Sequence, residues 1–153
     1  MKRIQLGDVL EIPLSDGRKA YGQYVFKDKM GPLVQVFDLI TKDNIELEQI
    51  KNAKLLFPPV FTGLFAAVRG GVWKVIGRIP IEEFKYPGFI SVYVGPSNQV
   101  GTWYLWDGKQ SIPIGHKLPK EFKQLEQMIV WDPNNLAHRI ETGVNPYDYL
   151  VQA

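Results

Sequence analysis

The sequence of 153 residues contains no cysteine and only two histidines, His116 and His138. Without cysteine there can be no disulfide, thiolate zinc site, iron–sulfur cluster or cysteine nucleophile, and a reducing compartment fits this composition. Neither histidine has a second one at the short spacing of a metal-binding pair. We therefore predict no metal site and no cofactor, and we interpret both histidines as surface or structural residues.

Long hydrophobic runs are also missing. The opening stretch MKRIQLGDVL lacks the apolar core of a signal peptide, and the apolar run Leu55–Val68 is interrupted by Pro58, Pro59 and Gly63. A membrane-spanning helix requires about 20 apolar residues, so this run is too short to cross a bilayer. We predict a cytoplasmic protein with no membrane segment.

The motifs of familiar enzyme classes are absent. Gly70-Gly71 is followed by Val72-Trp73, which is neither a dinucleotide fingerprint nor a phosphate-binding loop. Glu82 and Glu83 are adjacent, so their carboxylates point apart and favour a solvated turn. None of the serines lies in a G-x-S-x-G elbow: Ser15, Ser91, Ser97 and Ser111. An active site assembled from residues distant in sequence stays as one alternative, and it requires a cleft in which ionisable groups converge.

The charge is nearly balanced, at a net +2. The basic residues are dispersed, unlike the clustered footprint of a nucleic-acid-binding protein, so the pattern disfavours nucleic acid as a partner. The charge is unevenly distributed in one segment, residues 38–48. It contains one basic residue, Lys42, and four acidic ones: Asp38, Asp43, Glu46 and Glu48. Such a cluster is usually a solvated loop or helix face, and it gains a role only if a basic partner contacts it.

A composition of 45% hydrophobic and 22% charged residues is that of a globular protein, and we predict one domain over residues 1–153. Apolar runs rich in aromatic and β-branched residues, separated by Gly, Pro, Asn and Asp, predict a mainly β core. The predicted strands are Asp8–Pro13, Lys19–Phe26, Leu33–Ile40, Ala53–Phe57, Phe61–Val68, Trp73–Ile79, Phe89–Val94, Thr102–Trp106 and Ser111–Ile114. The predicted turns are Asp16-Gly17, Gly70-Gly71, Asn98-Gln99 and Asp107-Gly108.

Two hairpins are predicted from these turns. The first, Gly7–Phe26, reverses at Ser15-Asp16-Gly17, and the second, Leu55–Pro80, reverses at Arg69-Gly70-Gly71. Pro58-Pro59 predicts a bend between strands, because neither proline can donate a ladder hydrogen bond. The core is expected to include Leu56, Phe57 and Trp73.

Helices are few in this interpretation. Short ones are predicted at residues 46–51 and 119–128, and a clearer one at residues 133–143, where an Asn can cap the start and Gly143 can adopt the left-handed conformation at the end. The predicted fold class is mainly β (α+β): a strongly curved or barrel-like antiparallel sheet with a few short helices and the C-terminal helix packed on it.

One strand is unusually aromatic. Alternation places Trp103 and Leu105 on one face, and Tyr104 and Trp106 on the other. Either the strand is covered on both sides, between the sheet and the C-terminal helix, or the face of Tyr104 and Trp106 is a binding surface of the kind that aromatic residues form at interfaces.

Four segments together carry a resemblance to a known family: GDVLEIPLSDGRKAYGQYVF, LLFPPVFTGLFAAVRGGVWKVIGRIP, WYLWDG and RIETGVNPYDYL. They resemble the immunity protein 26 family, small bacterial antitoxins of polymorphic toxin and contact-dependent systems. The resemblance implies a protein that neutralises a cognate toxin, in many cases a nuclease, by stoichiometric binding and without catalysis. Candidate toxin contacts are then Asp38, Asp43, Glu46, Glu48, Tyr104 and Trp106. The net charge of +2 argues against wholesale mimicry of nucleic acid.

The main alternative is a small β-barrel binding module for nucleic acid or a small ligand. Its motivation is a set of aromatic residues available for stacking: Trp103, Trp106, Tyr147 and Tyr149. Aromatic stacking of single strands works together with a basic groove, which the dispersed bases do not indicate.

Overall fold

The computed structural model describes residues 3–93 and 101–151. The chain forms two compact units: unit 1 comprises Met1–Phe84 and Val130–Val144, and unit 2 comprises Lys85–Ile129 and Asn145–Ala153. The chain therefore leaves unit 1, returns to it and leaves it again, so neither unit is one continuous segment. A single domain over residues 1–153 stays a prediction. In the described ranges no helix has the length and apolar character needed to cross a membrane.

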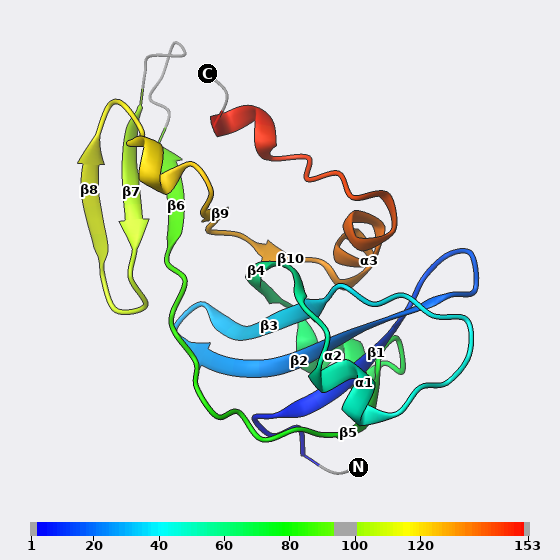
Figure 1. Ribbon diagram of the computed structural model, residues 1–153. Coiled ribbons are helices and arrows are strands. Elements are labelled where there is room, and N and C mark those ends of the chain that lie inside the picture. The colour runs from blue at the N-terminus through cyan, green and yellow to red at the C-terminus, as the bar shows by residue number, and fades with distance from the viewer. Residues whose placement is uncertain (1–2, 94–100, 152–153) are drawn as a thin grey trace. The chain divides into compact units, whose positions relative to one another are not determined.

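Unit 1 is built on a six-stranded sheet with the order β10-β4-β3-β2-β1-β5 (Figure 1). Neighbouring strands are antiparallel except β10 and β4, which are parallel. The strands are β1 (Asp8–Pro13), β2 (Lys19–Asp28), β3 (Gly31–Phe37), β4 (Leu55–Thr62), β5 (Lys74–Arg78) and β10 (Val130–Trp131).

Unit 2 contains a four-stranded sheet with the order β8-β7-β6-β9, in which β9 runs parallel to β6. Its strands are β6 (Phe89–Tyr93), β7 (Thr102–Trp106), β8 (Ser111–Gly115) and β9 (Glu126–Gln127), and its 3₁₀ helices are η2 (Lys120–Phe122) and η3 (Asp148–Val151).

The predicted mainly β class with few short helices is confirmed, whereas the single barrel-like antiparallel sheet is wrong. Both sheets are mixed, and in residues 3–93 and 101–151 neither closes on itself. The separation occurs between β5 and β6, where residues 79–88 form no strand. Pro80 and Pro87 lie in this stretch and lack the N–H that a ladder requires.

The first predicted hairpin is confirmed. β1 and β2 pair from Val9 opposite Gln23 to Pro13 opposite Lys19. Gly17 turns the chain with φ +87°, a conformation that glycine adopts without a steric penalty. In this turn the Asp16 carboxylate accepts hydrogen bonds from the Arg18 backbone N–H and from the Arg18 guanidinium. Both lower the pKa of Asp16, and the backbone N–H has the larger effect.

The second predicted hairpin is wrong. β4 is followed by the helix α2 (Leu64–Arg69), and β5 pairs with β1 instead of β4. Gly71, with φ +76°, ends the helix. Its N–H donates to Val68 and the next N–H donates to Ala67, which is a Schellman ending. The predicted strand Phe61–Val68 is wrong from Leu64 onward for this reason: a short apolar run has no periodicity that separates a buried strand from a buried helix.

The predicted bend at Pro58-Pro59 is also wrong, because both prolines lie inside β4. Phe57 pairs with Val36 and Val60 pairs with Val34, and the register shifts between these pairs. At such an irregularity the ladder of hydrogen bonds is interrupted, so the N–H groups that the two prolines lack are not required. Prolines are tolerated in sheets at positions of this kind.

Two of the three predicted helices are present in the structure. α1 (Leu47–Lys51) and α3 (Pro133–Thr142) form as predicted, and Gly143 ends α3 with φ +75°. The predicted Asn cap of α3 is wrong, because the cap is Asp132, whose carboxylate accepts the N–H of Asn134 at 2.9 Å. The helix predicted at residues 119–128 is wrong, since that stretch forms η2 and β9. The turn predicted at Asn98-Gln99 lies outside the described residues.

The core prediction is confirmed for Trp73, which is 2% exposed, and is wrong for Leu56, which is 36% exposed. Phe57 is half-buried. α3 packs against β4, and its Arg139 guanidinium lies 3.8 Å from the centre of the Phe57 ring. Packing from α3 thus contributes to the partial burial of Phe57.

Candidate functional site

The four acidic candidates lie on one segment of unit 1. Asp38 follows β3, Asp43 lies in the loop before α1, Glu46 caps the start of α1 and Glu48 lies in its first turn. All four side chains are exposed. In the part of the chain that the structure describes, none of them forms an ion pair.

Apolar residues between the acids anchor this segment to the sheet. Ile50 of α1 is fully buried, and Leu39, Ile45 and Leu47 pack against the same core cluster. That cluster is formed by Val9, Tyr21, Phe37, Ile50 and Ile79. Because the apolar side chains occupy the inner side of the segment, the acids are left on its outer side.

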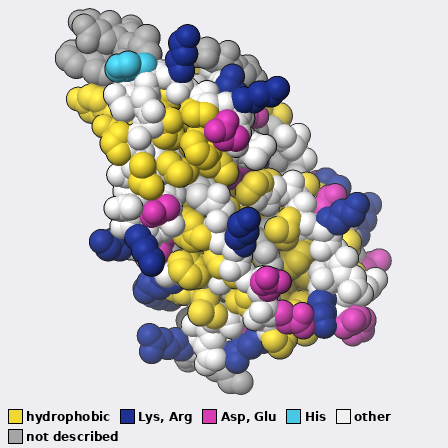
Figure 2. Space-filling view, turned by 60° about the vertical axis from the view of Figure 1, so that its left-hand side comes forward, with side chains coloured by type: hydrophobic (Ala, Val, Ile, Leu, Met, Phe, Trp, Pro, Cys, Tyr) yellow, Lys and Arg dark blue, Asp and Glu magenta, His cyan; other side chains and the backbone are white. Residues whose placement is uncertain are grey.

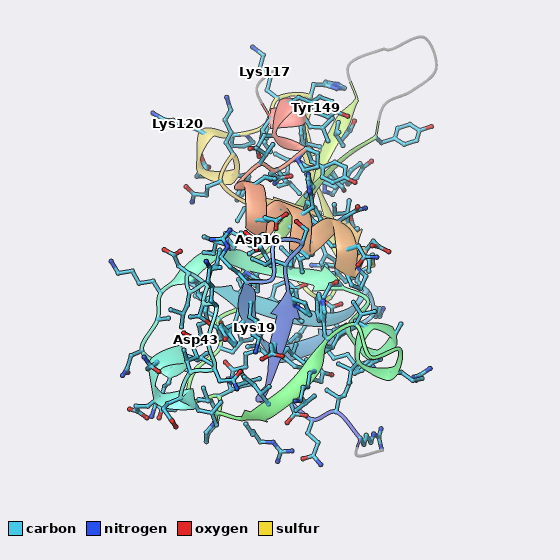
Figure 3. The ribbon with its side chains drawn as sticks, turned by 90° about the vertical axis from the view of Figure 1, so that its right-hand side faces the viewer. Asp16, Lys19, Asp43, Lys117, Lys120 and Tyr149 are labelled. Atoms are coloured by element: carbon cyan, nitrogen blue, oxygen red, sulfur yellow. The ribbon has the colours of Figure 1, made fainter. Side chains whose placement is uncertain are left out.

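Hydrogen bonds hold the loop that carries Asp43. The backbones of Lys19 and Thr41 bond to each other at 2.7 and 2.9 Å, and the Tyr21 hydroxyl lies 2.7 Å from the Thr41 hydroxyl. Thr41 in turn donates to the backbone carbonyl of Asp43 at 2.8 Å. The Lys19 ammonium donates to the Asn44 side chain at 2.7 Å, and Figure 3 labels Lys19 and Asp43 in this part of unit 1. The acidic segment is therefore a fixed surface of unit 1.

The aromatic candidates belong to unit 2. Tyr104 and Trp106 are half-buried on β7, while Trp103 is buried. Tyr104 lies opposite Ser91, and Trp106 lies opposite Phe89. The acidic and aromatic candidates are thus on different units, and each set is treated as a separate surface.

Unit 2 also exposes large hydrophobic side chains that the sequence did not single out as a group. They come from three elements: Tyr93 of β6, Ile112 of β8 and Tyr149 of η3. Figure 2 shows hydrophobic side chains gathered beside the histidine in the upper part of that view. Lysines accompany them, and Figure 3 shows Lys117, Lys120 and Tyr149 in the same part of the unit.

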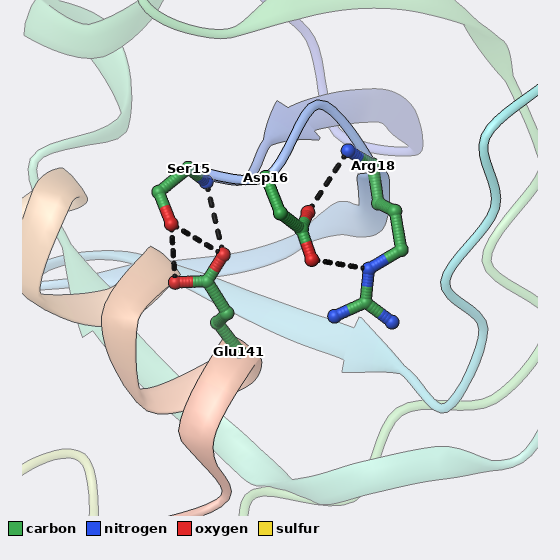
Figure 4. A network of polar contacts seen from close by, with 4 residues as sticks. All are labelled: Ser15, Asp16, Arg18 and Glu141. Atoms are coloured by element: carbon green, nitrogen blue, oxygen red, sulfur yellow. Dashed lines mark hydrogen bonds and ion pairs between the residues drawn. The ribbon is translucent and has the colours of Figure 1, made fainter.

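A cavity of about 390 Å³ in unit 1 brings together Ser15, His138 and Glu141. The Ser15 hydroxyl lies 2.7 Å from both carboxylate oxygens of Glu141, and its backbone N–H donates to the same carboxylate at 3.0 Å (Figure 4). His138 is not a hydrogen-bond partner of Ser15 in the described residues. An activated serine requires a base that accepts its proton and is itself oriented. We therefore interpret the Ser15–Glu141 hydrogen bonds as a structural link between the first hairpin turn and α3. No group of three or more potential ligands for a metal ion occurs among the described residues.

A second cavity in unit 1, of about 440 Å³, was missed by the sequence analysis. Its lining includes Arg3, Tyr24, Lys27, Phe65 and Arg69. These residues come from the N-terminal segment, β2 and α2. Because they are far apart in the chain and their basic residues do not form a run, no local pattern identifies them.

The described residues thus form a mainly β protein whose acidic segment is exposed. The family model for immunity protein 26 matches residues 5–94, more than half of the chain, and the chain belongs to that family. The match ends before Trp103–Gly108 and Arg139–Leu150, two segments that carried the resemblance in the sequence. No curated protein and no solved structure matches the chain.

Proposed function

We propose that this protein is an antitoxin of a bacterial polymorphic or contact-dependent toxin system, and that it neutralises its cognate toxin in the cytoplasm by stoichiometric binding. The observation that carries the proposal is membership of the immunity protein 26 family. Inhibition by binding requires a surface that is complementary to the toxin, and it requires no chemistry from the antitoxin.

The acidic segment is the contact surface that we propose first, with Asp38, Asp43, Glu46 and Glu48 as its charges. A basic nuclease cleft is the complementary partner, because opposite potentials accelerate encounter and exclude wrong partners. The fixed backbone around Asp43 supports this choice, since a surface that is already ordered loses little conformational entropy on binding.

Co-expression with the C-terminal domain of the toxin encoded beside this protein tests the function. We expect protection of the cells and a one-to-one complex by isothermal titration. Loss of protection together with absence of binding would overturn the antitoxin proposal.

A charge-reversed pair tests the surface. The double variant Asp43→Lys, Glu46→Lys should stay folded despite losing the Glu46 cap of α1, and it should slow association about tenfold at low salt. Glu82→Lys, Glu83→Lys is the matched control, because both glutamates are exposed in unit 1 and the change in charge is the same. Equal association rates for the two variants would overturn the acidic surface while leaving the antitoxin function intact.

Tyr104 and Trp106 are the second proposed contact surface. Half-buried aromatic residues supply large contact area at low entropic cost. If the acidic variants bind at the wild-type rate, Trp106→Ala should weaken the complex, and this is measured by titration after the fold of the variant has been checked by circular dichroism. Wild-type affinity for that variant would remove β7 from the interface.

A further inference from the structure

The cavity lined by Arg3, Lys27 and Arg69 combines three cations with aromatic walls. No carboxylate is among its lining residues: Arg3, Ile4, Tyr24, Lys27, Phe65, Val68 and Arg69. A volume of about 440 Å³ lies within the range of small-molecule sites, roughly 300–1,000 Å³. The cavity is therefore large enough for a small ligand and electrostatically suited to an anion.

A β-bulge places Tyr24 and Lys27 in the same cavity. In a regular strand, residues three apart point to opposite faces. In β2, Tyr24 pairs with Val34 whereas Phe26 pairs with Leu33, so Val25 is an extra residue. The extra residue shifts the alternation, and both Tyr24 and Lys27 consequently line the cavity.

Helix α2 supplies the opposite wall. Phe65, Val68 and Arg69 have the spacing of one helix face, and all three line the cavity, while Leu64 and Ala67 are buried. Phe65 meets Tyr24 edge to face, with ring centres 5.7 Å apart. The Lys27 ammonium lies 5.6 Å from the centre of the Phe65 ring, a contact that holds this cation beside the cavity.

The third cation, Arg3, comes from the segment before β1. The Gly7 N–H donates to the carbonyl of Tyr24 at 2.8 Å, which fastens this segment beside β2. The Gln5 N–H donates to the buried Asp8 carboxylate at 2.8 Å, and Arg78 pairs with the same carboxylate at 3.0 Å. Asp8 is thus neutralised by Arg78, and it is not a counter-ion for Arg3.

The cations and one phenol remain available to a ligand. Within residues 3–93 and 101–151, none of Arg3, Lys27 and Arg69 forms an ion pair. Tyr24 is 6% exposed, and its hydroxyl has no hydrogen-bond partner in the same residues. Burial raises the pKa of Tyr24, and the positive charge of Arg3 opposes this increase. The hydroxyl therefore stays protonated at neutral pH and can donate a hydrogen bond.

We propose that this cavity binds the phosphate group of a small phosphorylated molecule, with Lys27, Arg69 and Arg3 neutralising its charge and the Tyr24 hydroxyl donating to one of its oxygens. Arginine donates to phosphate in a forked geometry, and lysine acts as a point charge. The inference does not rest on the antitoxin proposal, because the cavity is formed by the N-terminal segment, β2 and α2, and none of the acidic candidates lines it.

Isothermal titration of the full chain tests the site with three probes at constant ionic strength: inorganic phosphate, pyrophosphate and adenosine monophosphate. We expect saturable one-to-one binding of at least one probe. Arg69→Gln and Lys27→Gln should each weaken it about tenfold, because each removes a charge-assisted contact. Tyr24→Phe keeps the ring and should weaken it several-fold. Lys54→Gln is the matched control, since Lys54 is exposed and lies outside the cavity lining.

The probes distinguish the source of the phosphate. Tighter binding of adenosine monophosphate than of phosphate indicates a nucleotide-like ligand, and the reverse order indicates a free phosphate compound. Amide chemical shifts of the wild-type protein provide a readout that needs no variant, and Lys27, Phe65 and Arg69 should respond to the probe. Absence of saturable binding by all three probes, or binding that is unaffected by Arg69→Gln and Lys27→Gln, overturns the proposal.

Discussion

Glu141 of α3 accepts hydrogen bonds from both the hydroxyl and the backbone N–H of Ser15, a residue 126 positions earlier in the chain. This pair joins the first hairpin turn to the last helix of unit 1. Glu141→Ala removes the acceptor for both donors, and we expect the free energy of unfolding to fall by about 1–2 kcal/mol, a modest loss because the site is near solvent. Urea denaturation measures it.

Ser15→Ala removes only the hydroxyl and should cost less than Glu141→Ala. Glu83→Ala is the control, because Glu83 is exposed and should be neutral to within about 0.5 kcal/mol. If Glu141→Ala is as stable as this control, the link does not contribute to stability.

Arg139 illustrates a buried cation held by aromatic rings. Its side chain is 7% exposed, and the guanidinium carbon lies 3.8 Å from the Phe57 ring centre and 5.1 Å from that of Trp131. Lysine keeps the charge but loses the planar group that stacks, so we expect Arg139→Lys to cost about 1–2 kcal/mol. Unfolding followed by tryptophan fluorescence measures the change. The same substitution at the exposed Arg69 should have no comparable effect.

Gly77 and Leu47 define a close approach between β5 and α1. A Cβ atom on Gly77 would lie 2.6 Å from one Leu47 methyl carbon, so Gly77→Ala must displace the leucine side chain. We expect a loss of about 1–2 kcal/mol. Adding Gly77→Ala to Leu47→Ala should cost much less than adding it to the wild type, because the clash is gone. Additive losses in this double-mutant cycle would contradict the proposed clash.

The division of unit 1 along the chain predicts how a fragment behaves. Residues 1–94, which include the family match, lack β10 and α3, and so lack the buried side chains of Trp131, Leu136 and Ile140. They also lack the Trp131 carbonyl that accepts the Thr62 hydroxyl at 2.8 Å. We expect this fragment to show no cooperative thermal transition by circular dichroism.

The full chain should unfold in one transition, as the single-domain prediction requires. A fragment 1–94 that unfolds cooperatively near the wild-type temperature would show that β10 and α3 are dispensable. Two separate transitions of the full chain would show instead that the units are independent domains.

Local signals account for the parts of the fold that the sequence predicted. The turn at Asp16-Gly17 and the end of α3 at Gly143 both depend on a glycine with positive φ between clear apolar patterns. The four exposed acids were also correctly placed outside the core, because carboxylates are rarely buried without a partner.

The remainder depends on pairing between distant segments. β5 pairs with β1, and β10 pairs in parallel with β4. Neither pairing can be predicted from a short window of sequence. The same holds for the basic cavity, since its residues meet through the bulge in β2 and the position of α2. The strand predicted at Phe61–Val68 is a helix from Leu64 onward, because apolar content alone does not distinguish a buried strand from a buried helix.

The bulge at Val25 makes the composition of the basic cavity depend on the length of β2 as well as on its residues. Removing one residue there would restore regular alternation and turn Lys27 to the other side of the sheet, even though every cation of the cavity would still be present in the sequence. Among relatives of this chain, an insertion or deletion at this point could therefore create or abolish the cavity in a single evolutionary step. Counting residues between Gly22 and Pro32 would then be more informative than comparing their identities.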